Sequence, residues 1–483
     1  MSHPSMIRQT KIVATLGPAT TEPAVLERLI AAGVDVVRMN FSHGTAQEHT
    51  DRARSVREIA TRLGRDVAIM ADLQGPKIRI GKYAANSTTL VNGQSYILDA
   101  DCKEGNDERV GLDYPELVND VKSGDTLLLD DGRIVMQVNR VAGREIHCLV
   151  KVGGILKSRK GINKLGGGLS APALTGKDME DIRTAVGFEA DYIAVSFPKS
   201  GADMYMAREL MRAAGGSSMM IAKIERFEAL HSLEDILKAC DGVMVARGDL
   251  AVEIGDAAVP AVQKRLIRQA REFNKLTITA TQMMESMIES PVPTRAEVSD
   301  VANAVIDGTD AVMLSAETAA GKFPVETVEA MSRICVEAEK SAQVTLDADF
   351  LNRTFTRVDQ SIAMGALFTA HHLKVKAIAA LTQSGSTALW MSRLNSGVPI
   401  YALTPEEKTR RRLSLYRDVR TIMLPLQTDR DLLLANAEKA LLDAGVVSLG
   451  DLIVITVGEP IGTPGGTNTL KIVRVGEHIQ NLN

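Results

Sequence analysis

Charged and hydroxyl-bearing residues follow short apolar runs in this sequence, at the points where buried strands would end. They are Arg38, Asn40, Ser42, Asp72, Lys223, Glu225, Arg247, Asp249, Thr281, Gln282, Ser315 and Glu317. A single charged residue at a strand end is usually a structural ion pair. When polar groups at six strand ends converge on one mouth, we instead expect an active site, because barrel enzymes carry their sites at the carboxyl ends of the strands.

These residue types suit chemistry on a phosphate-bearing substrate. Glu225 and Asp249 suit a hard divalent cation, Mg²⁺ or Mn²⁺, which takes one or two carboxylates together with substrate oxygens. Cations aimed at the same place would hold a phosphate, and the candidates are Arg38, Arg79, Lys223 and Arg247. The backbone amides of Gly248 and Asp249 could donate to a substrate carboxylate. Phosphoryl transfer is the natural reaction class.

The common nucleotide-binding and hydrolytic motifs are absent from the sequence. It contains no GxxxxGK[ST] loop, no GxGxxG and no HRD or DFG set, and it has neither HExxH nor GxSxG. The residues alone therefore predict a metal-dependent enzyme that acts on a phosphoryl group or an enolate.

The apolar runs themselves predict an α/β fold built on a (β/α)8 barrel. Most are continuous Val, Ile, Ala and Met runs, which is typical of parallel strands buried on both faces. The candidate strands are Lys11–Gly17, Val34–Ser42, Val67–Gln74, Asp191–Phe197, Met219–Glu225, Gly242–Leu250, Thr277–Gln282 and Ala311–Ser315. Helical patterns follow, for example Val259–Phe273, and capping boxes at Thr175 and Thr294 mark two helix starts.

Two further units complete the predicted organisation. Turn signals between short Val/Leu/Ile runs in Lys77–Gly168 indicate a small all-β insertion, with Gly166–Gly168 as its hinge. Beyond a predicted linker, Ser341–Thr356, strands and helices alternate again as an α/β domain. We therefore expect a barrel domain over 1–74 and 169–342, a β-rich lid over 75–168 and a C-terminal domain over 343–483.

Composition excludes several other classes of protein. The chain has 483 residues, a net charge of −4 and 4% aromatic residues, which gives no footprint for nucleic acid or an anionic membrane. The four cysteines form no CxxC pair, so we expect buried reduced thiols rather than disulfides or zinc. Neither a signal segment nor a membrane span is predicted, and a soluble cytoplasmic protein is the expectation.

Eight ordered segments resemble the pyruvate kinase family. They are Thr10–Ala19, Arg38–Gly44, Asp72–Arg79, Ala222–Glu225, Met244–Leu250, Ala280–Met287, Pro293–Glu297 and Met313–Thr318. The resemblance implies a barrel, a β-rich lid, a regulatory α/β domain and a homotetramer. It also implies phosphoenolpyruvate and ADP or ATP as substrates, with a divalent cation.

The resemblance assigns roles to individual residues. Glu225 and Asp249 would be the metal ligands, and Lys223 would stabilise the phosphoryl group in flight. Phosphoenolpyruvate would contact Arg38, Gly248 and Thr281, with Arg247 and Asp249 beside them, and Thr281 would lie near the proton transfer to the enolate. The nucleotide would meet Asn40, Ser42, His43, Arg79 and Lys160. Ser196 and Ser315 are either supporting residues or strand-end hydroxyls that bond to the backbone.

Two positions depart from the K⁺-dependent pattern of the family. Asn40, Ser42 and Asp72 are present, but Leu73 replaces a Thr and Lys77 replaces a Glu. This set resembles the K⁺-independent branch, in which the ammonium of Lys77 would supply the charge of a bound K⁺. The alternative is a solvated lysine at the lid hinge.

An effector site is expected in the C-terminal domain. The loop Leu381–Thr387 resembles the family's effector-phosphate site, and its candidate ligands are Thr382, Ser384, Ser386 and Thr387. A simple helix cap by Ser384 or Ser386 is the alternative. The last loop, Gly458–Gly466, lacks Trp and Arg, so a sugar monophosphate or AMP is the expected effector. Arg410–Arg412 would either help to bind it or form a solvated helix face.

Two other functions share parts of this pattern. A metal-dependent aldolase or lyase acting on pyruvate enolate would use Glu225 and Asp249 without needing Lys223 or a lid carrying Lys160. An inactive metabolite-sensing scaffold would be expected to have lost part of the Lys223, Glu225 and Asp249 set, which is intact.

Overall fold

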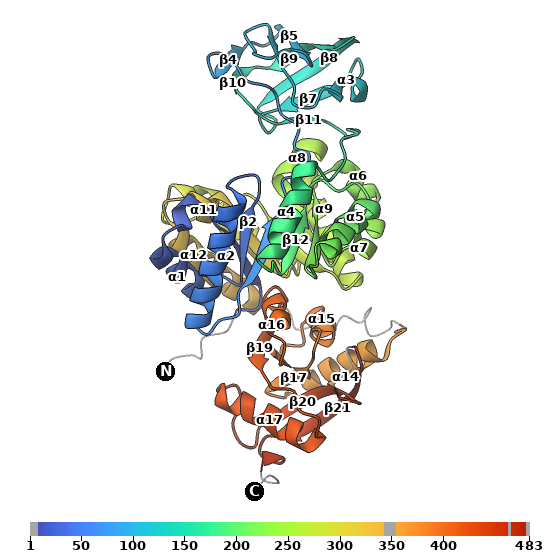
Figure 1. The fold of residues 1–483 in the computed structure, drawn as a ribbon. Coiled ribbons are helices and arrows are strands. Elements are labelled where there is room, and N and C mark those ends of the chain that lie inside the picture. Colours follow the sequence, from blue (N-terminus) through green and yellow to red (C-terminus); the bar gives the residue numbers. More distant parts are fainter. Residues whose placement is uncertain (1–7, 342–353, 462–464, 480–483) are drawn as a thin grey trace.

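The computed structural model describes residues 8–341, 354–461 and 465–479. The predicted linker at 341–356 therefore lies largely outside the described residues. Three units follow one another along the long axis of the molecule, with the lid at the top, the barrel in the middle and the C-terminal domain below (Figure 1). In the described part of the chain, no helix is both long and apolar enough to cross a membrane.

The central unit is a closed barrel of eight parallel strands, as the sequence predicts. Around the barrel the order is β1-β16-β15-β14-β13-β12-β3-β2. The strands are β1 (Lys11–Thr15), β2 (Val36–Asn40), β3 (Ala68–Asp72), β12 (Tyr192–Val195), β13 (Met219–Ile224), β14 (Gly242–Ala246), β15 (Leu276–Ala280) and β16 (Ala311–Leu314). Their residues are buried almost throughout, which explains the continuous apolar runs.

Helices form the outer ring of the barrel. They are α1 (Pro23–Ala31), α2 (Ala46–Arg62), α4 (Gly176–Gly187), α5 (Gly201–Ala213), α6 (Phe227–His231), α7 (Leu233–Ala239), α8 (Arg247–Ile254), α9 (Val259–Glu272), α10 (Arg295–Ile306), α11 (Ala316–Ala319) and α12 (Pro324–Ser341). Both predicted capping boxes are confirmed: the Thr175 and Thr294 hydroxyls accept from the amides of Asp178 and Glu297, whose carboxylates reach back.

The predicted strand Gly242–Leu250 is wrong in its second half. β14 ends at Ala246, and α8 begins at Arg247. Arg247 and Asp249 therefore lie on the first helical turn rather than two apart on a strand. The acidic residue in that turn is favourable because the amino end of a helix carries partial positive charge. Gly255, with φ of 84°, ends the helix.

The lid is built on β-sheets with its own apolar core. A six-stranded sheet has the order β11-β7-β8-β9-β5-β6, and β10 pairs with β4 in a second sheet. The strands are β4 (Ser87–Leu90), β5 (Ser95–Asp99), β6 (Arg109–Val110), β7 (Thr126–Leu129), β8 (Ile134–Ala142), β9 (Glu145–Val152), β10 (Gly154–Lys157) and β11 (Ile162–Lys164), with a short helix, α3 (Leu117–Asp120).

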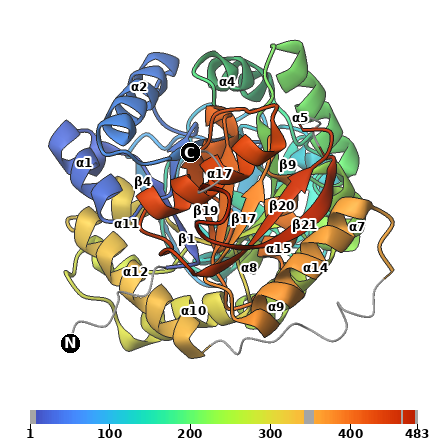
Figure 2. The ribbon, with the colours of Figure 1, turned by 90° about the horizontal axis from the view of Figure 1, so that it is seen from below.

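The C-terminal domain has a five-stranded sheet of order β19-β18-β17-β20-β21, whose edge strand β21 is antiparallel. Its strands are β17 (Ala377–Leu381), β18 (Ile400–Thr404), β19 (Val419–Met423), β20 (Leu452–Gly458) and β21 (Thr467–Arg474). Its helices are α14 (Val358–Leu373), α15 (Ser386–Ser392), α16 (Glu407–Leu413) and α17 (Arg430–Asp443). Seen from below, the domain lies across the end of the barrel opposite the lid (Figure 2).

Candidate active site

Lys223 is the central cation of the barrel mouth. Its Nζ lies 2.8 Å from Glu225 Oε1 and 3.2 Å from Asp72 Oδ1, and it donates to the Ser196 hydroxyl at 2.7 Å. Burial alone would lower the pKa of Lys223, but the charges of Asp72 and Glu225 outweigh it and raise the pKa above 10.5. The lysine is therefore held charged at the site where a phosphate would arrive.

Arg38 joins this cluster from the neighbouring strand end. Its Nε donates to Asp72 Oδ2 at 2.6 Å, and its Nη1 donates to the Thr15 hydroxyl at 2.9 Å. Burial would raise the pKa of Asp72, yet Arg38 and Lys223 together hold it below 3.8. Both oxygens of Asp72 are thus neutralised by protein cations.

Glu225 and Asp249 are the candidate metal ligands. Glu225 is 1% exposed, and its Oε2 accepts the Phe197 amide at 2.8 Å. Its pKa is raised above 4.5 by burial and by the nearby charge of Asp249, although Lys223 opposes the shift. Burial and the neighbouring charge of Asp249 disfavour the charged form of Glu225, which a bound cation would stabilise, so this pair of carboxylates fits Mg²⁺ or Mn²⁺.

Within the described parts of the chain, this pair is not part of a larger set of metal-binding side chains. Across the described residues, no group of three or more His, Cys, Asp or Glu side chains could hold a metal ion. The remaining ligands of a cation would therefore be substrate oxygens and water, which is the usual arrangement for Mg²⁺. Lys77 approaches from the lid side, with its Nζ 3.2 Å from Asp249 Oδ1.

The loop after β15 is held in an unusual backbone conformation. Thr281 and Gln282 have φ of 70° and 55°, and Phe197 at the end of β12 has φ of 56°. Non-glycine residues with such values cost free energy and cluster at functional sites. The Thr281 hydroxyl donates to the Ala280 carbonyl at 2.6 Å and accepts the Gly248 amide at 2.9 Å.

The Arg247 side chain holds the backbone of this loop by hydrogen bonds. Its Nη1 pairs with Asp300 of α10 at 2.7 Å, and its Nη2 donates to the Thr281 carbonyl at 2.6 Å. Its Nε donates to the Ala280 carbonyl at 3.2 Å. In this arrangement Arg247 fixes the backbone of Thr281, and the direct substrate contact expected for it stays a prediction.

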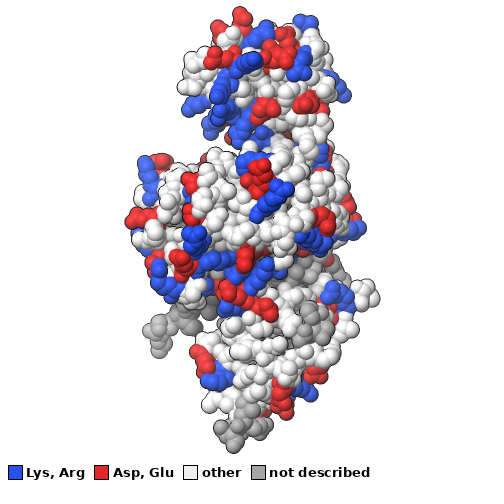
Figure 3. All heavy atoms as spheres, viewed as in Figure 1, with Lys and Arg blue, Asp and Glu red and all other residues white. Residues whose placement is uncertain are grey.

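The candidate nucleotide residues fall into two groups. Asn40 and Ser42 lie at the barrel mouth, where the Ser42 amide donates to Asn40 Oδ1 at 3.1 Å, and the exposed His43 follows them. Arg79 and Lys160 belong to the lid, where Arg79 pairs with Gly161 in a β-bridge. Arg79 donates to the Arg159 carbonyl at 3.2 Å, and Lys160 lies 2.7 Å from Asp130. Basic side chains also gather on the lower part of the lid in Figure 3.

The supporting serines behave differently from each other. The Ser196 hydroxyl accepts from Lys223 and donates to the Leu73 carbonyl at 2.7 Å. The Ser315 amide donates to Glu317 Oε2 at 2.6 Å, and the other Glu317 oxygen accepts the Met284 amide at 3.2 Å. Glu317 thus anchors the loops after β15 and β16 and does not point a free charge at the mouth.

A pocket in the C-terminal domain contains most of the candidate effector residues. It lies at the carboxyl end of β17 and is lined by Thr382, Ser384 and Thr387 among apolar neighbours such as Leu426 and Ile461. The Thr387 hydroxyl bonds to that of Thr467 at 2.7 Å. Ser386, whose hydroxyl lies 3.3 Å from Asp359 Oδ2, is not among the lining residues.

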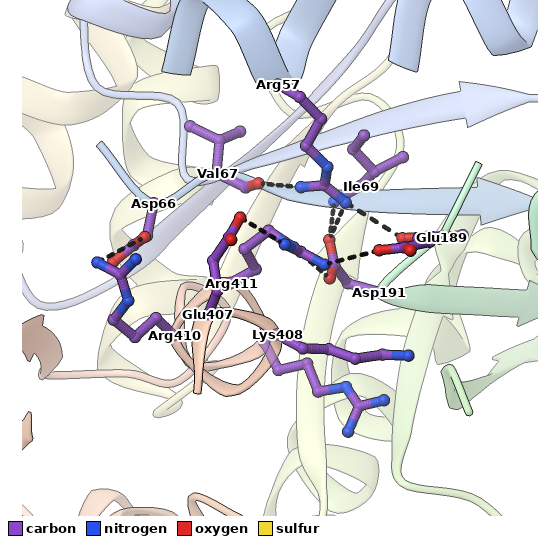
Figure 4. Close-up of polar contacts among 12 residues, drawn as sticks. Arg57, Asp66, Val67, Ile69, Glu189, Asp191, Glu407, Lys408, Arg410 and Arg411 are labelled. Atoms are coloured by element: carbon purple, nitrogen blue, oxygen red, sulfur yellow. Dashed lines mark hydrogen bonds and ion pairs between the residues drawn. The ribbon is translucent and has the colours of Figure 1, made fainter. Parts of the chain in front are cut away.

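One of the two roles predicted for Arg410–Arg412, the solvated helix face, is wrong, and the contribution to effector binding stays a prediction. The three arginines of α16 are neither a solvated face nor part of the pocket wall, because α16 lies against the barrel (Figure 4). Arg411 Nε is 3.0 Å from Asp191 Oδ1, the Oδ2 of the same carboxylate pairs with Arg57, and Arg410 lies 3.4 Å from Asp66. Acidic residues just before β3 and β12 thus bind Arg410 and Arg411, whereas Arg412 donates to Ser217.

Several functional partners are not evident from the sequence. Thr15 orients Arg38, and Asp300 orients Arg247, but no spacing connects either residue with its partner. Glu253, a buried carboxylate at the lid hinge, is a third. Its only sequence signal is a carboxylate four residues after Asp249, which places both on one side of a helix once α8 is known.

The site by itself defines a class of protein. Buried cations surround two carboxylates at the carboxyl mouth of a (β/α)8 barrel, which is the equipment of an enzyme acting on an anionic, phosphate-bearing substrate.

Comparisons with known proteins identify the family. Two family models match the chain. The model described as the pyruvate kinase barrel domain matches residues 7–328, and the model described as the pyruvate kinase alpha/beta domain matches residues 360–473. Pyruvate kinase II of Salmonella typhimurium is 52% identical over 475 residues, which is 97% of this chain and 99% of that protein. The pyruvate kinase of Haemophilus influenzae is 50% identical over 94% of this chain and 96% of its own length.

A relative of lower identity also matches almost the whole chain. The pyruvate kinase of Mycobacterium tuberculosis strain H37Rv is 42% identical over 98% of this chain and 99% of its own length. The chain therefore belongs to the pyruvate kinase family and is a phosphotransferase.

Proposed function

We propose that the enzyme transfers the phosphoryl group of phosphoenolpyruvate to ADP with a divalent cation held by Glu225 and Asp249. The bond between phosphorus and the enol oxygen breaks, and a bond to a β-phosphate oxygen of ADP forms. The enolate left behind takes a proton at its methylene carbon to give pyruvate. The cation, when bound, neutralises negative charge that develops on the reacting oxygens.

The geometry around Lys223 carries this proposal. Lys223 and Arg38 are fixed by Asp72, Ser196 and Thr15, so their charges need no reorganisation when the phosphoryl group moves between its two oxygens. Thr281 holds the Gly248 amide, and a substrate carboxylate would take over this amide. That exchange would place the Thr281 hydroxyl beside the enolate.

The lid residues would complete the nucleotide site. Arg79 and Lys160 carry positive charge on the lid, and closure would bring them onto the ADP phosphates and exclude water. Pyruvate formation from phosphoenolpyruvate and ADP tests the proposal, with Mg²⁺ as cation. We expect turnover to fall steeply in Glu225→Gln and in Asp249→Asn. Equal turnover in these variants would overturn the assignment of the metal ligands.

We also propose that the enzyme does not require K⁺. The oxygens of Asp72, one of the family's K⁺ ligands, already pair with Arg38 and Lys223, and the side chain of Leu73 offers no oxygen. Lys77 adds an ammonium 3.2 Å from Asp249. We expect full activity in buffer free of K⁺, Na⁺ and NH₄⁺, and reduced activity in Lys77→Met. Strong activation of the wild-type enzyme by K⁺ would refute this.

The C-terminal pocket is our proposed effector site, for a sugar monophosphate or AMP. Thr382, Ser384 and Thr387 supply hydroxyls there, and the Thr409 hydroxyl of α16 donates to the Gln383 carbonyl of the same loop at 2.6 Å. Because α16 also contacts the barrel, occupancy of the pocket can affect the barrel. The test is the phosphoenolpyruvate saturation curve with and without each effector. Ser384→Asp, which repels phosphate, should abolish any shift, and curves that no effector shifts would refute the proposal.

A homotetramer is the proposed assembly. Large apolar side chains are exposed on two separate elements, at Val298 and Ile306 of α10 and at Phe368 and Leu373 of α14, and a tetramer with two kinds of interface would cover both. Light scattering should give four times the 52.0 kDa chain mass, 208 kDa. A monomer mass of 52.0 kDa would contradict it.

A further inference from the structure

Glu253 is a buried carboxylate whose surroundings disfavour its negative charge. It is 4% exposed and stands in the last turn of α8, where the negative end of the helix dipole disfavours an anion. Burial is the main reason that its pKa is raised to about 7. A carboxylate kept at such a position suggests a function beyond folding.

The side chain of Glu253 reaches toward the metal site. Its Oε2 accepts the Phe227 amide at 2.8 Å, and Phe227 begins α6 two residues after Glu225. On its own helix, Glu253 lies one turn after Asp249 and on the same side. The Glu253 carboxylate is therefore connected to both backbone segments that carry the proposed metal ligands, the start of α6 after Glu225 and the helix α8 with Asp249.

The same residue holds the strand by which the lid returns to the barrel. The side chain of Asn163, in β11, hydrogen-bonds to the Glu253 carboxylate, and the Gly166 amide donates to the Glu253 carbonyl at 3.2 Å. Arg226 adds a hydrogen bond to the Leu169 carbonyl at 3.3 Å. Glu253 and Asn163 also line a cavity between the two lid connections, with Lys77 on the outgoing one.

We propose that Glu253 is a positioning residue of the phosphoryl-transfer site, whose carboxylate sets the two metal-binding segments relative to each other and to the returning strand of the lid. The inference rests on the proposed metal site at Glu225 and Asp249. Residues that orient metal ligands typically change metal affinity 10- to 100-fold (roughly) when removed. The groups that face the Glu253 carboxylate are Arg226, Glu228, Asn163 and the Phe227 amide.

The test measures the dissociation constant of Mn²⁺ by electron paramagnetic resonance. It uses the full-length protein in the absence of substrates, so no turnover takes place. Glu253→Ala removes the acceptor of the Phe227 amide, and we expect the dissociation constant to rise about 10- to 100-fold. Glu253→Gln keeps the acceptor and removes only the charge. Its dissociation constant should match that of the wild type at pH 6, where Glu253 is mostly protonated, and exceed it several-fold at pH 8. A purely structural role would not produce this pH-dependent ratio.

Glu339→Gln is the matched control. Glu339 is also 4% exposed and accepts two amides, from Gln9 at 2.9 Å and Thr10 at 2.7 Å, but it lies at the opposite end of the barrel. Glu253→Ala and Glu253→Gln variants that bind Mn²⁺ like this control at both pH values would overturn the inference alone. If Asp249→Asn also kept full Mn²⁺ affinity, the proposed metal site would fail and the inference with it.

Discussion

The ion pair between the barrel and the C-terminal domain can be tested by charge removal. Asp191 is fully buried, and its carboxylate accepts three hydrogen bonds, from Arg411 at 3.0 Å, from Arg57 at 2.8 Å and from the Ile69 amide at 2.8 Å. Asp191→Asn removes the charge that two guanidinium groups share. Breaking a buried pair in this way costs about 3–5 kcal/mol because it leaves its partners uncompensated.

Replacing Arg411, the partner of Asp191, should lower the free energy of unfolding by less. In Arg411→Gln, Asp191 keeps Arg57 and the Ile69 amide, so only one charge-assisted bond is lost, worth about 1.5–3 kcal/mol. The contacts of Arg411 with Glu407 and Glu189 add little, because those carboxylates are largely exposed. The double variant should cost about as much as Asp191→Asn alone, since the two residues share one interaction.

Urea unfolding followed by far-ultraviolet circular dichroism, to which both domains contribute, measures these costs. The fluorescence of the only tryptophan, Trp390 on α15, reports separately on the C-terminal domain, since the chain need not unfold in one step. Arg430→Gln, which breaks a surface pair with Glu459 in the same domain, is the control and should cost less than about 1 kcal/mol. A cost of Arg411→Gln equal to or above that of Asp191→Asn would refute the reasoning.

Three further predictions concern the residues Lys223, Thr281 and Glu253. Lys223→Met should lower kcat by at least about 10³-fold in steady-state assays, because loss of a positioned cation has an effect of this size in phosphoryl transfer. The control Lys264→Met, at an exposed lysine, should keep the wild-type kcat, and a fall of less than tenfold in Lys223→Met would contradict the role of Lys223. Thr281→Val should lower kcat about 10²-fold and Thr281→Ser should restore it, whereas equal rates would exclude the hydroxyl. Folding raises the pKa of Glu253 from 4.5 to about 7. Between these two pH values the native state holds a proton that the unfolded state has lost, so the free energy of unfolding falls as the pH rises from 4.5 to about 7. Relative to Glu253→Gln, the wild type should lose about 3 kcal/mol between pH 4 and pH 8 in urea unfolding, and a constant difference would contradict the shift.

Much of the fold follows from hydrophobic pattern alone. Each of the eight predicted barrel strands overlaps an observed strand, because strands buried on both faces have an unmistakable run of apolar residues. The capping boxes at Thr175 and Thr294 are equally local signals. The boundary at Ala246 is not visible in the sequence, because Gly242–Leu250 is apolar enough for either strand or helix.

The site was predictable in its residue types but not in its pairings. Lys223, Glu225 and Asp72 converge as expected from strand ends. Arg247 looks like another substrate cation in the sequence, yet Asp300, far away along the chain, binds its guanidinium. Arg411 is similar, since only the fold brings it to Asp191. Long-range ion pairs depend on tertiary structure and leave no periodic signal.

The most direct test of the account is a Mg²⁺ titration of pyruvate formation from phosphoenolpyruvate and ADP, with the wild-type enzyme and Asp249→Asn side by side. We predict saturable Mg²⁺ activation of the wild type and, for the variant, a half-activating Mg²⁺ concentration raised at least about tenfold with a much lower plateau. The same activation curve for both proteins would contradict the claim that Glu225 and Asp249 hold the cation at the barrel mouth.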